Sequence, residues 1–429
     1  MRKYYSLYGR MLNIQALYEG FKKVYRAKGA AGIDGQSLEQ FASNLAVNLQ
    51  TLQHELQTKQ YRAQPVKRVE IPKDDGGVRQ LGIPTVRDRI VQQTLLDLLQ
   101  PIFEPEFHPS SYGYRPGRSG HDAISKATVF IRDYSRRWVV DMDLSKCFDK
   151  LDHEIIITSV KRKVTDGSIL KLIQQFLDSG VMVDGKWEAS EVGSPQGGVI
   201  SPLLANIYLN AFDQEMKRRK HRIVRYADDI LILCGSKSAA DNALRQATQI
   251  LEKELKLTVN KTKTHIAHSD DGIKFLGVEI GSRHTRIQKK KLKGFKQKVK
   301  AMTRRNGGMN LATMISQLNP VIRGFTNYFS IANCKREFEL LAQWIRRRLR
   351  AVQLKLWKKP SRLHRRLKQL KYKPPFKFIK MNSWRNSASP LANYAMSNKW
   401  FEEMKLFSME GVNTGWIARS VYIKNPDRM

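Results

Sequence analysis

Two adjacent aspartates interrupt an apolar, β-rich stretch of this sequence. Residues 223–233 read Ile-Val-Arg-Tyr-Ala-Asp-Asp-Ile-Leu-Ile-Leu, with Asp228 and Asp229 near the centre. Strand interiors exclude aspartate, whereas tight turns accept it. The stretch therefore predicts a β-hairpin that carries two carboxylates at its tip. Taken alone, the pair is better explained as an ordinary acidic turn.

A third aspartate lies on an earlier predicted strand and favours a chemical role for the pair. Residues 139–149 begin as a strand, in which alternation puts Asp141 and Asp143 on one face. Carboxylates from neighbouring strands form the oxygen-rich site that Mg²⁺ prefers. Two such ions can clamp the attacking and leaving oxygens of an in-line phosphoryl transfer. We therefore expect Asp143, Asp228 and Asp229 to hold two Mg²⁺ ions.

The charge of the chain indicates a polyanionic partner. It has 76 Lys and Arg against 39 Asp and Glu, a formal net charge of +37. A nucleic acid offsets such self-repulsion, because each neutralised phosphate releases a counterion. A membrane surface is the alternative, but the sequence shows no amphipathic anchor, lipidation signal or apolar run of membrane-spanning length.

Cellular location follows from other absences in the sequence. No apolar segment follows the basic N-terminus, so a secretory signal is not expected. The three cysteines, Cys147, Cys234 and Cys334, are far apart and suggest neither disulfides nor a zinc site. We expect a soluble protein of a reducing cytoplasm, without a membrane partner.

The order of predicted elements indicates an α+β fold. Residues 61–84 predict a basic β-hairpin with a turn at residues 74–77. Strands predicted at 138–144, 222–226 and 230–233 interleave with helices at about 152–178, 201–218 and 238–256, without the even rhythm of a parallel sheet.

Composition changes near residue 286. Residues 286–380 contain 28 Lys and Arg and only two acids, together with a helical spacing of apolar residues. Such helices could simply have solvated faces, but a basic helical module that lies along RNA or a duplex is favoured. The last fifty residues, with several tryptophans among polar residues, suggest a small separate domain.

The motifs together resemble those of bacterial group II intron reverse transcriptases, also called maturases. Tyr226-Ala-Asp-Asp229 is similar to the Y-x-D-D signature of reverse transcriptases. The other matching segments, in the family's order, are Gly32-Ile-Asp-Gly35, Ile71-Pro-Lys73, Arg79-Gln-Leu-Gly-Ile-Pro84, Ser111-Tyr-Gly-Tyr-Arg-Pro-Gly-Arg118, the Asp143 strand, Gly193-Ser-Pro-Gln-Gly-Gly198, Val259-Asn-Lys-Thr-Lys263 and Phe275-Leu-Gly277.

The resemblance implies a right-hand polymerase with three regions. These are fingers and palm with an N-terminal extension at 1–285, a helical thumb at 286–360, and a C-terminal DNA-binding domain at 361–429. A nuclease domain rich in His and paired Cys, which many members carry, is absent from the sequence. The chain is in this respect similar to the shorter, class C-like members.

The resemblance also implies roles around the incoming nucleotide. Lys73 and Arg79 would contact its triphosphate, Phe148 would close the sugar pocket, and Gln196 would make a polar contact. Lys263 would protonate the leaving pyrophosphate as a general acid. The alternatives are solvated charge for the two cations, a core position for Phe148 and a simple loop around Gln196. Arg115 could hold the nucleotide or equally serve as a structural ion-pair partner.

Further residues are expected to contact the nucleic acid itself. Phe275 and Gly277 resemble the turn that grips the primer end, although an apolar strand end would explain them almost as well. The complete set is Arg118, Gly197, Phe275, Gly277, Lys289, Lys290, Lys291, Arg346, Arg347, Arg348 and Arg350.

The expected function is that of an RNA-directed DNA polymerase of a mobile intron. During retrohoming at a target DNA, it would extend a DNA primer with dNTPs on an RNA template. It would also bind the intron RNA and assist its splicing. Two alternatives stay open. One is a maturase that only assists splicing, and the other is a related bacterial reverse transcriptase of host defence or diversity generation.

Overall fold

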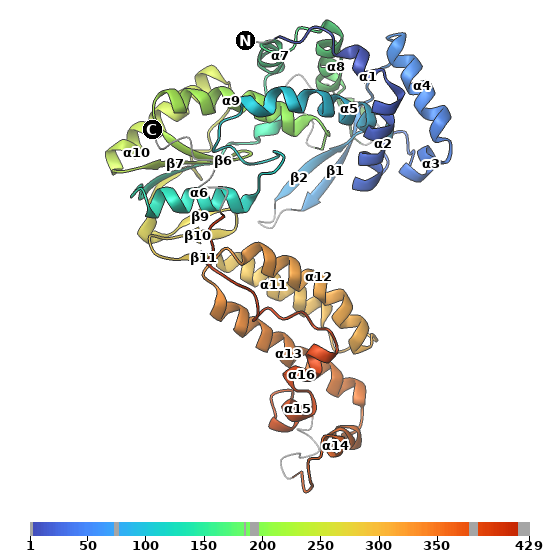
Figure 1. Ribbon diagram of the computed structural model, residues 1–429, viewed down its shortest axis with the longest axis vertical. Helices are drawn as coiled ribbons and strands as arrows, with labels where there is room; N and C mark the ends of the chain where they lie inside the picture. The colour runs from blue at the N-terminus through green and yellow to red at the C-terminus, as the bar shows by residue number, and fades with distance from the viewer. Residues whose placement is uncertain (1–2, 73–76, 184–185, 189–196, 377–384, 419–429) are drawn as a thin grey trace. The chain divides into compact units, whose positions relative to one another are not determined.

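The computed structural model divides the chain into two compact units. The first contains Met1–His268 and the second Ser269–Tyr422 (Figure 1). The residues described are 3–72, 77–183, 186–188, 197–376 and 385–418. Both units mix helices and strands, so the α+β class predicted from the sequence is confirmed. The three functional regions with boundaries at residues 285 and 360 stay a prediction.

The first unit holds most of the chain's regular structure. Its helices are α1 (Tyr8–Met11), α2 (Ile14–Ala27), α3 (Leu38–Ser43), α4 (Leu45–Gln57), α5 (Val86–Phe103), η1 (Glu104–Glu106), α6 (Gly120–Arg132), η2 (Cys147–Lys150), α7 (His153–Lys161), α8 (Gly167–Asp178), α9 (Ser201–Arg218), α10 (Lys237–Gln249) and η3 (Ile250–Glu254). Its strands are β1 (Val66–Pro72), β2 (Val78–Ile83), β3 (Trp138–Met142), β4 (Val181–Val183), β5 (Lys186–Glu188), β6 (Arg222–Tyr226), β7 (Asp229–Cys234) and β8 (His265–His268).

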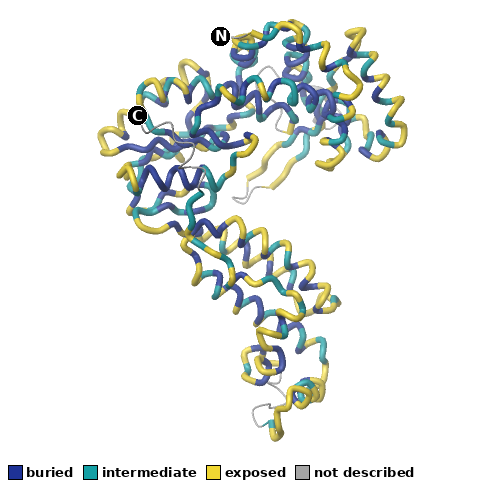
Figure 2. Tube along the Cα trace, viewed as in Figure 1, coloured by how far each residue is buried: buried dark blue, intermediate teal, exposed yellow. Residues whose placement is uncertain are grey.

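A long hairpin forms one side of a four-stranded sheet in this unit. Strands β1 and β2 pair antiparallel from Lys67 opposite Ile83 to Pro72 opposite Val78, and the sheet order is β2-β1-β4-β5. The outer parts of β1 and β2 are exposed, as the yellow segments of this hairpin in Figure 2 show. The two paired strands of the predicted hairpin are therefore confirmed, whereas residues 74–76 of its predicted turn lie outside the described residues.

A second sheet, of order β6-β7-β3-β8, carries the predicted carboxylates. Helices α6, α9 and α10 pack against its strands. The central strand β7 is buried from Ile230 to Cys234, and β3 is buried at Val139, Val140 and Met142. β7 is therefore buried on both faces, as expected for an apolar strand at the centre of a covered sheet.

One predicted helix proved to be two. The segment 152–178 was predicted as continuous, but α7 ends at Lys161 and α8 begins at Gly167. Between them, Val164 forms a bridge with Tyr4, and the Asp166 carboxylate accepts hydrogen bonds from the backbone N–H groups of Ser168 and Ile169. This N-cap starts a new helix, because it satisfies amides that have no partner in the first turn.

The second unit combines a small sheet with a helical bundle. Its elements are η4 (Ser269–Asp271), β9 (Ile273–Phe275), β10 (Val278–Ile280), β11 (Thr285–Ile287), α11 (Lys289–Met302), α12 (Leu311–Phe329), α13 (Lys335–Trp357), α14 (Pro360–Gln369), α15 (Pro390–Ala395) and α16 (Asn398–Glu403). The sheet order is β11-β10-β9, and α12 packs between α11 and α13 (Figure 1). In the described part of the chain, no helix is long and apolar enough to cross a membrane.

Candidate active site and nucleic-acid interface

The three predicted aspartates lie at neighbouring strand ends of the second sheet. Tyr226 at the end of β6 pairs with Asp229 at the start of β7, so Ala227 and Asp228 form the hairpin loop. In the adjacent ladder Met142 pairs with Ile230. The next residues in this antiparallel register are Asp143 and Asp229, and the structure therefore brings the two acidic segments together.

Asp143 is held by the segment that follows η3. Its backbone N–H donates to Thr264 Oγ1 (3.1 Å), and its carbonyl accepts from the backbone N–H of Asn260 (2.9 Å). The side-chain amide of Asn260 donates to Asp143 Oδ2 (3.0 Å). Lys263 Nζ lies 3.8 Å from the same oxygen. The predicted general acid Lys263 is thus beside one of the predicted metal ligands.

The carboxylates raise one another's pKa values. Burial, followed by the charges of Asp228, Asp141 and Asp143, raises the pKa of Asp229 to about 7. Burial is also the main cause that raises the pKa of Asp141 to about 6, with a further contribution from Asp143. Burial and the charge of Asp143 raise the pKa of Asp228 too. The site concentrates negative charge that only nearby cations relieve.

This donor set fits a divalent metal ion. Hard cations prefer carboxylate oxygens, and a cation would stabilise the ionised forms that burial and mutual repulsion disfavour. Among the described residues, no group of three or more His, Cys, Asp or Glu side chains is already arranged to coordinate a metal ion. The fit therefore rests on the charge and chemistry of the oxygens, not on a preformed cage.

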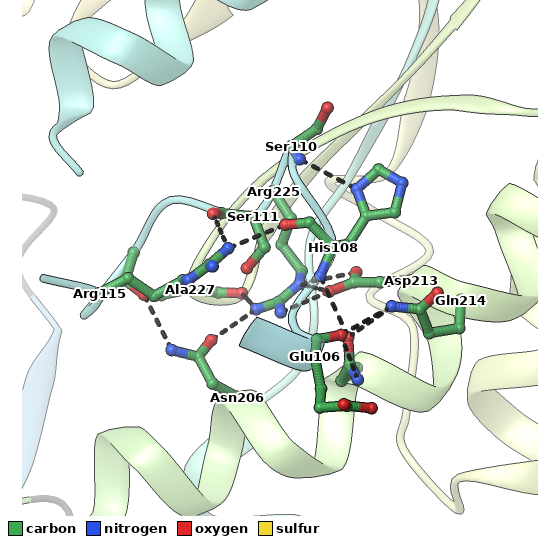
Figure 3. Close-up of polar contacts among 12 residues, drawn as sticks. Glu106, His108, Ser110, Ser111, Arg115, Asn206, Asp213, Gln214, Arg225 and Ala227 are labelled. Carbon is green, nitrogen blue, oxygen red and sulfur yellow. Dashed lines mark hydrogen bonds and ion pairs between the residues drawn. The ribbon is translucent and has the colours of Figure 1, made fainter. Parts of the chain in front are cut away.

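A buried ion pair fixes the hairpin that carries Asp228 (Figure 3). The Arg225 guanidinium donates to both carboxylate oxygens of Asp213 on α9 (Nε to Oδ1 2.9 Å; Nη2 to Oδ2 2.6 Å). Its Nη1 donates to Asn206 Oδ1 (3.0 Å) and to the carbonyl of Ala227 in the loop (2.8 Å). Asp213 and Arg225 are fully buried, and Asn206 is 2% exposed. We call these three side chains the α9 clamp.

The segment before α6 lies directly against the same loop. The backbone N–H of Arg225 donates to Ser110 O, and the backbone N–H of Tyr112 donates to Arg225 O (both 2.9 Å). Asn206 Nδ2 donates to Gly113 O (2.9 Å). A Cβ atom on Gly113 would come within 2.3 Å of the Ala227 nitrogen. Only glycine permits this approach of two backbone segments.

The predicted nucleotide contacts are only partly described by the structure. Arg79 is exposed on β2, and its charge opposes the rise in the pKa of Asp228, which puts it within electrostatic reach of the carboxylates. Lys73 and Gln196 lie outside the described residues. Gly197 has φ +115°, and a Cβ atom there would come within 2.2 Å of Gly82 O. A glycine at position 197 therefore lets the backbone pack closely on β2. This packing accounts for the glycine without a contact to the template.

Phe148 lies in the short η2 helix that follows Asp143. Its side chain is half-buried and packs against the main core of the first unit. Its ring also meets the ring of Tyr114 edge to face, with centroids 6.3 Å apart and planes at 79°. The Phe148 ring contacts the core and is also partly exposed, so both alternatives are compatible with its position. Its role in the sugar pocket stays a prediction.

The geometry of Arg115 favours the structural alternative. Its Nε donates to both carboxylate oxygens of Glu104, and its Nη2 donates to Glu104 Oε1 (2.7 Å) and O (3.2 Å). Its Nη1 donates to the carbonyls of His108 (2.8 Å) and Ser111 (2.7 Å). All five N–H groups of the guanidinium are engaged within the protein. The expected nucleotide contact of Arg115 is therefore not supported.

Arg118 is also engaged within the protein. It is half-buried, donates to Pro109 O, and its guanidinium carbon lies 5.5 Å from the centroid of the Tyr112 ring. Burial lowers its pKa first of all, and the neighbouring charge of Arg115 acts in the same direction. A contact of Arg118 with phosphate stays a prediction.

The predicted primer-grip segment is a two-residue turn between β9 and β10. Phe275 pairs with Val278, and both Leu276 (φ 46°) and Gly277 (φ +84°) have left-handed backbone conformations. The Phe275 side chain is buried, while Tyr328 Oη donates to Leu276 O (2.8 Å). The apolar strand end is therefore the better account of Phe275. A primer contact would have to come from the turn itself.

The arginines of α13 divide between two faces. Arg346 makes a bidentate ion pair with Glu410 (Nη1 to Oε2 2.9 Å; Nη2 to Oε1 2.8 Å). Arg350 donates to Met396 O (2.9 Å), and burial lowers its pKa to about 10. Both are buried, one helical turn apart on the apolar face. They stabilise the unit from inside, and the predicted nucleic-acid contact of these two arginines stays a prediction that their internal partners do not favour.

Arg347 and Arg348 differ from their neighbours. Arg347 is exposed, and Arg348, half-buried, donates to Thr303 Oγ1 (2.6 Å). Both line a pocket of about 220 Å³ together with Arg305 and Trp344. Lys289, Lys290 and Lys291 are exposed at the start of α11. The sequence of α11 contains no acidic residue, so its lysines give the helix a strong positive charge.

Several residues of the site were not found from the sequence. Asn260 lies within a motif that the sequence showed, but its amide contact to Asp143 depends on a long-range approach of two segments. Asp141 was placed on the face of Asp143 and was given no role, although it raises the pKa of Asp229. Arg225 and Asp213 carried one weak signal, because each directly follows apolar residues in its element, Ile223-Val224 in β6 and Ala211-Phe212 in α9.

The fold and the carboxylate site define a nucleic-acid polymerase. Residues 71–280 match the reverse transcriptase (RNA-dependent DNA polymerase) family model, and residues 292–372 match the group II intron maturase-specific domain. The chain belongs to the group II intron-encoded reverse transcriptases and maturases, a class of RNA-directed DNA polymerases that use divalent metal ions.

Individual relatives agree with this assignment. Protein YkfC of Escherichia coli K12 is 37% identical, over 63% of this chain and 81% of that protein. The group II intron-encoded protein LtrA of Lactococcus lactis is 29% identical, over 65% of this chain and 57% of LtrA. A telomerase structure from Candida albicans aligns with a TM-score of 0.42 at 13% identity, over 74% of this chain and 63% of that chain, and adds nothing to the argument.

Proposed function

We propose that this protein copies intron RNA into DNA by nucleotidyl transfer at Asp143, Asp228 and Asp229. The observation that carries the proposal is the meeting of these residues at adjacent strand ends, where burial and neighbouring carboxylates raise the pKa values of Asp228 and Asp229. Two Mg²⁺ ions held there would activate the primer 3′-hydroxyl and neutralise charge on the departing pyrophosphate.

The residues of the chain have separable roles in this proposal. Asn260 orients Asp143 through its amide, and the α9 clamp fixes the loop that carries Asp228. Lys263, beside Asp143, would donate a proton to the pyrophosphate. Arg79, together with Lys73, would bind the triphosphate, and Phe148 would exclude a ribose 2′-hydroxyl. The polymerase would use a DNA primer, an RNA template and dNTPs.

The second unit supports a proposal for RNA binding. It contains the match to the maturase domain, exposed lysines at the start of α11 and the Arg305–Arg347–Arg348 pocket. These charges would bind the backbone of the parent intron RNA and so assist its splicing. Insertion of the copied intron at a target DNA is the remaining part of the proposal.

Primer extension tests the polymerase role. Asp228→Ala and Asp143→Asn should abolish extension of a DNA primer on an RNA template with dNTPs and Mg²⁺, because each removes charge from the metal site. RNA binding should be largely unchanged in both variants. The matched control is Asp241→Asn, an exposed aspartate on α10, which should extend primers like the wild type.

The same experiment separates this function from a splicing-only maturase. A protein that only assists splicing has no need of the carboxylates, so its RNA binding and splicing would continue while wild-type primer extension was absent. Full extension by Asp228→Ala would contradict the assigned site. Reduced RNA affinity in a folded Asp228→Ala variant would contradict separate roles for the two units.

A further inference from the structure

Tyr114 is an aromatic side chain beside the carboxylate site to which the proposed function gives no role. It is 55% exposed, although it follows four residues, Ser110 to Gly113, that are buried. Its φ of 57° is in the left-handed region, which is uncommon for a bulky residue. An aromatic held in such a conformation indicates that the surrounding contacts determine its position.

Those contacts are the ones that hold the hairpin loop. Gly113 O accepts from Asn206 of the α9 clamp, and Gly113 packs against the Ala227 nitrogen. Tyr112 is bonded to Arg225 through its backbone. Tyr114 directly follows Gly113, so its backbone is held by the same contacts that hold the loop of Asp228.

The ring of Tyr114 faces the predicted sugar pocket. It meets Phe148 edge to face at 6.3 Å, as described above. Its environment includes the metal-site carboxylates, because burial first and the charges of Asp228 and Tyr226 next raise the pKa of its hydroxyl, while Arg79 acts in the opposite direction. Tyr114 thus contacts Phe148, which would select the sugar, and lies within electrostatic reach of Asp228 and Arg79, which would hold the metal and the triphosphate.

We propose that Tyr114 is a positioning residue for sugar selection, which holds the Phe148 ring in the place that a ribose 2′-hydroxyl would occupy. This inference rests on the proposed polymerase function and on the proposed role of Phe148. The Phe148 ring has two neighbours, the core of the first unit and the ring of Tyr114, which it meets edge to face. Without the tyrosine ring, Phe148 has room to move and the pocket admits ribonucleotides.

The test compares kcat/KM for dNTP and rNTP incorporation in matched variants. Tyr114→Ala should lower the preference for dNTP by between about twofold and about tenfold, the range that an edge-to-face aromatic contact supplies. Tyr114→Phe keeps the ring and should retain wild-type discrimination. The control is Tyr134→Ala, which removes another partly exposed tyrosine that meets a phenylalanine, Phe130, edge to face, and which should leave discrimination unchanged.

A double variant tests whether Tyr114 acts through Phe148. Phe148→Ala alone should relax discrimination more than Tyr114→Ala, and the double variant should be no more relaxed than Phe148→Ala. Thermal unfolding of Tyr114→Ala should match the wild type, since that ring is exposed, whereas Phe148→Ala and the double variant should be less stable but still folded, because the Phe148 ring packs against the core. Unchanged discrimination in Tyr114→Ala, or fully additive effects in the double variant, would overturn the inference.

The two proposals fail in different ways. If Phe148→Ala admits ribonucleotides and Tyr114→Ala does not, the inference about Tyr114 is wrong and the proposed pocket stands. If neither variant changes discrimination in an active polymerase, the role of Phe148 is wrong and the inference is wrong with it. A wild-type protein that extends no primer overturns the proposed function itself.

Discussion

Arg225 is the single residue on which the position of the Asp228 loop depends most. Its side chain has no exposed surface, and it joins the loop carbonyl of Ala227 to Asp213 and Asn206. Burying two charges costs solvation that a good ion-pair geometry offsets, and removal of one partner leaves the other uncompensated. The ion pair therefore matters more for specifying the loop than for adding stability.

Asp213→Ala should destabilise the first unit by about 3–5 kcal/mol, because it leaves the Arg225 guanidinium buried without a counter-charge. Chemical denaturation followed by circular dichroism measures the decrease in unfolding free energy. Glu215→Ala is the matched control on the same helix, since Glu215 pairs with Arg218 and Arg219 near the surface. Surface pairs contribute little, so an equally large decrease in Glu215→Ala would contradict the burial argument.

The acidic residues of the site could be predicted from the sequence, whereas their partners could not. Asp228 and Asp229 alone could form an ordinary acidic turn, but together with Asp143 on another apolar strand they indicate a metal site. Asn260 and Arg225 act through contacts between distant segments, and no local pattern encodes those contacts. Arg115 shows the converse, because a motif arginine that suggested a ligand is fully engaged within the protein.

Helix α13 shows how one basic run serves two purposes. Residues 346–348 are three consecutive arginines, but a helix turns by about 100° at each residue and so directs them differently. Arg346 and Arg350 share the buried face, and Arg347 is exposed beside the pocket with Arg305. Net charge along the helix therefore overstates the charge that RNA can reach.

The separate variants Arg346→Gln and Arg347→Gln should differ in effect, one lowering stability and the other weakening RNA binding. Arg347→Gln should weaken RNA binding and reduce the slope of log K against log salt by about 0.7 to 0.9, because it removes one charge that would neutralise a phosphate. Arg346→Gln should lower the unfolding free energy by roughly 1–3 kcal/mol through removal of the Glu410 pair, and should leave the slope unchanged. Filter binding over a salt series and thermal unfolding measure the two effects, and the reverse pattern would refute the assignment.

Secondary structure was predictable where the pattern was long and regular. The hairpin of β1 and β2 and the strands β3, β6 and β7 lie where the sequence placed them. The break between α7 and α8 escaped prediction, because it depends on Asp166, whose carboxylate also accepts from the backbone N–H groups of Leu7 and Tyr8. The inward direction of Arg346 was available from helical spacing, since it follows buried Ala342 by one turn.

Positive charge is distributed unevenly over the whole molecule. The second unit, Ser269–Tyr422, contains 34 of the 76 Lys and Arg but only 8 of the 39 Asp and Glu. It also contains the match to the maturase domain. The unit with most of the excess charge is therefore the one expected to dominate the electrostatic part of RNA binding.

RNA affinity of the full chain should fall by about a thousandfold or more between 50 and 200 mM salt, as expected when about six or more phosphates are neutralised. Changing Lys289, Lys290 and Lys291 together to Gln should reduce the salt slope by about 2, at about 0.7 to 0.9 for each phosphate that is no longer neutralised. The same three residues changed to Arg form the control, which keeps the charge and should keep the slope. A flat salt dependence in the wild type would exclude this surface as the main contact.

The α9 clamp also limits how this protein can change in evolution. Arg225 forms hydrogen bonds with Asp213 and Asn206 in the buried interior. Replacing any one of the three therefore leaves a buried polar group without its hydrogen-bond partner. Neutral drift at these positions would have to proceed by paired replacements. The three sites are therefore expected to vary jointly among relatives, and to do so together with Gly113, whose backbone packs between Asn206 and the hairpin loop.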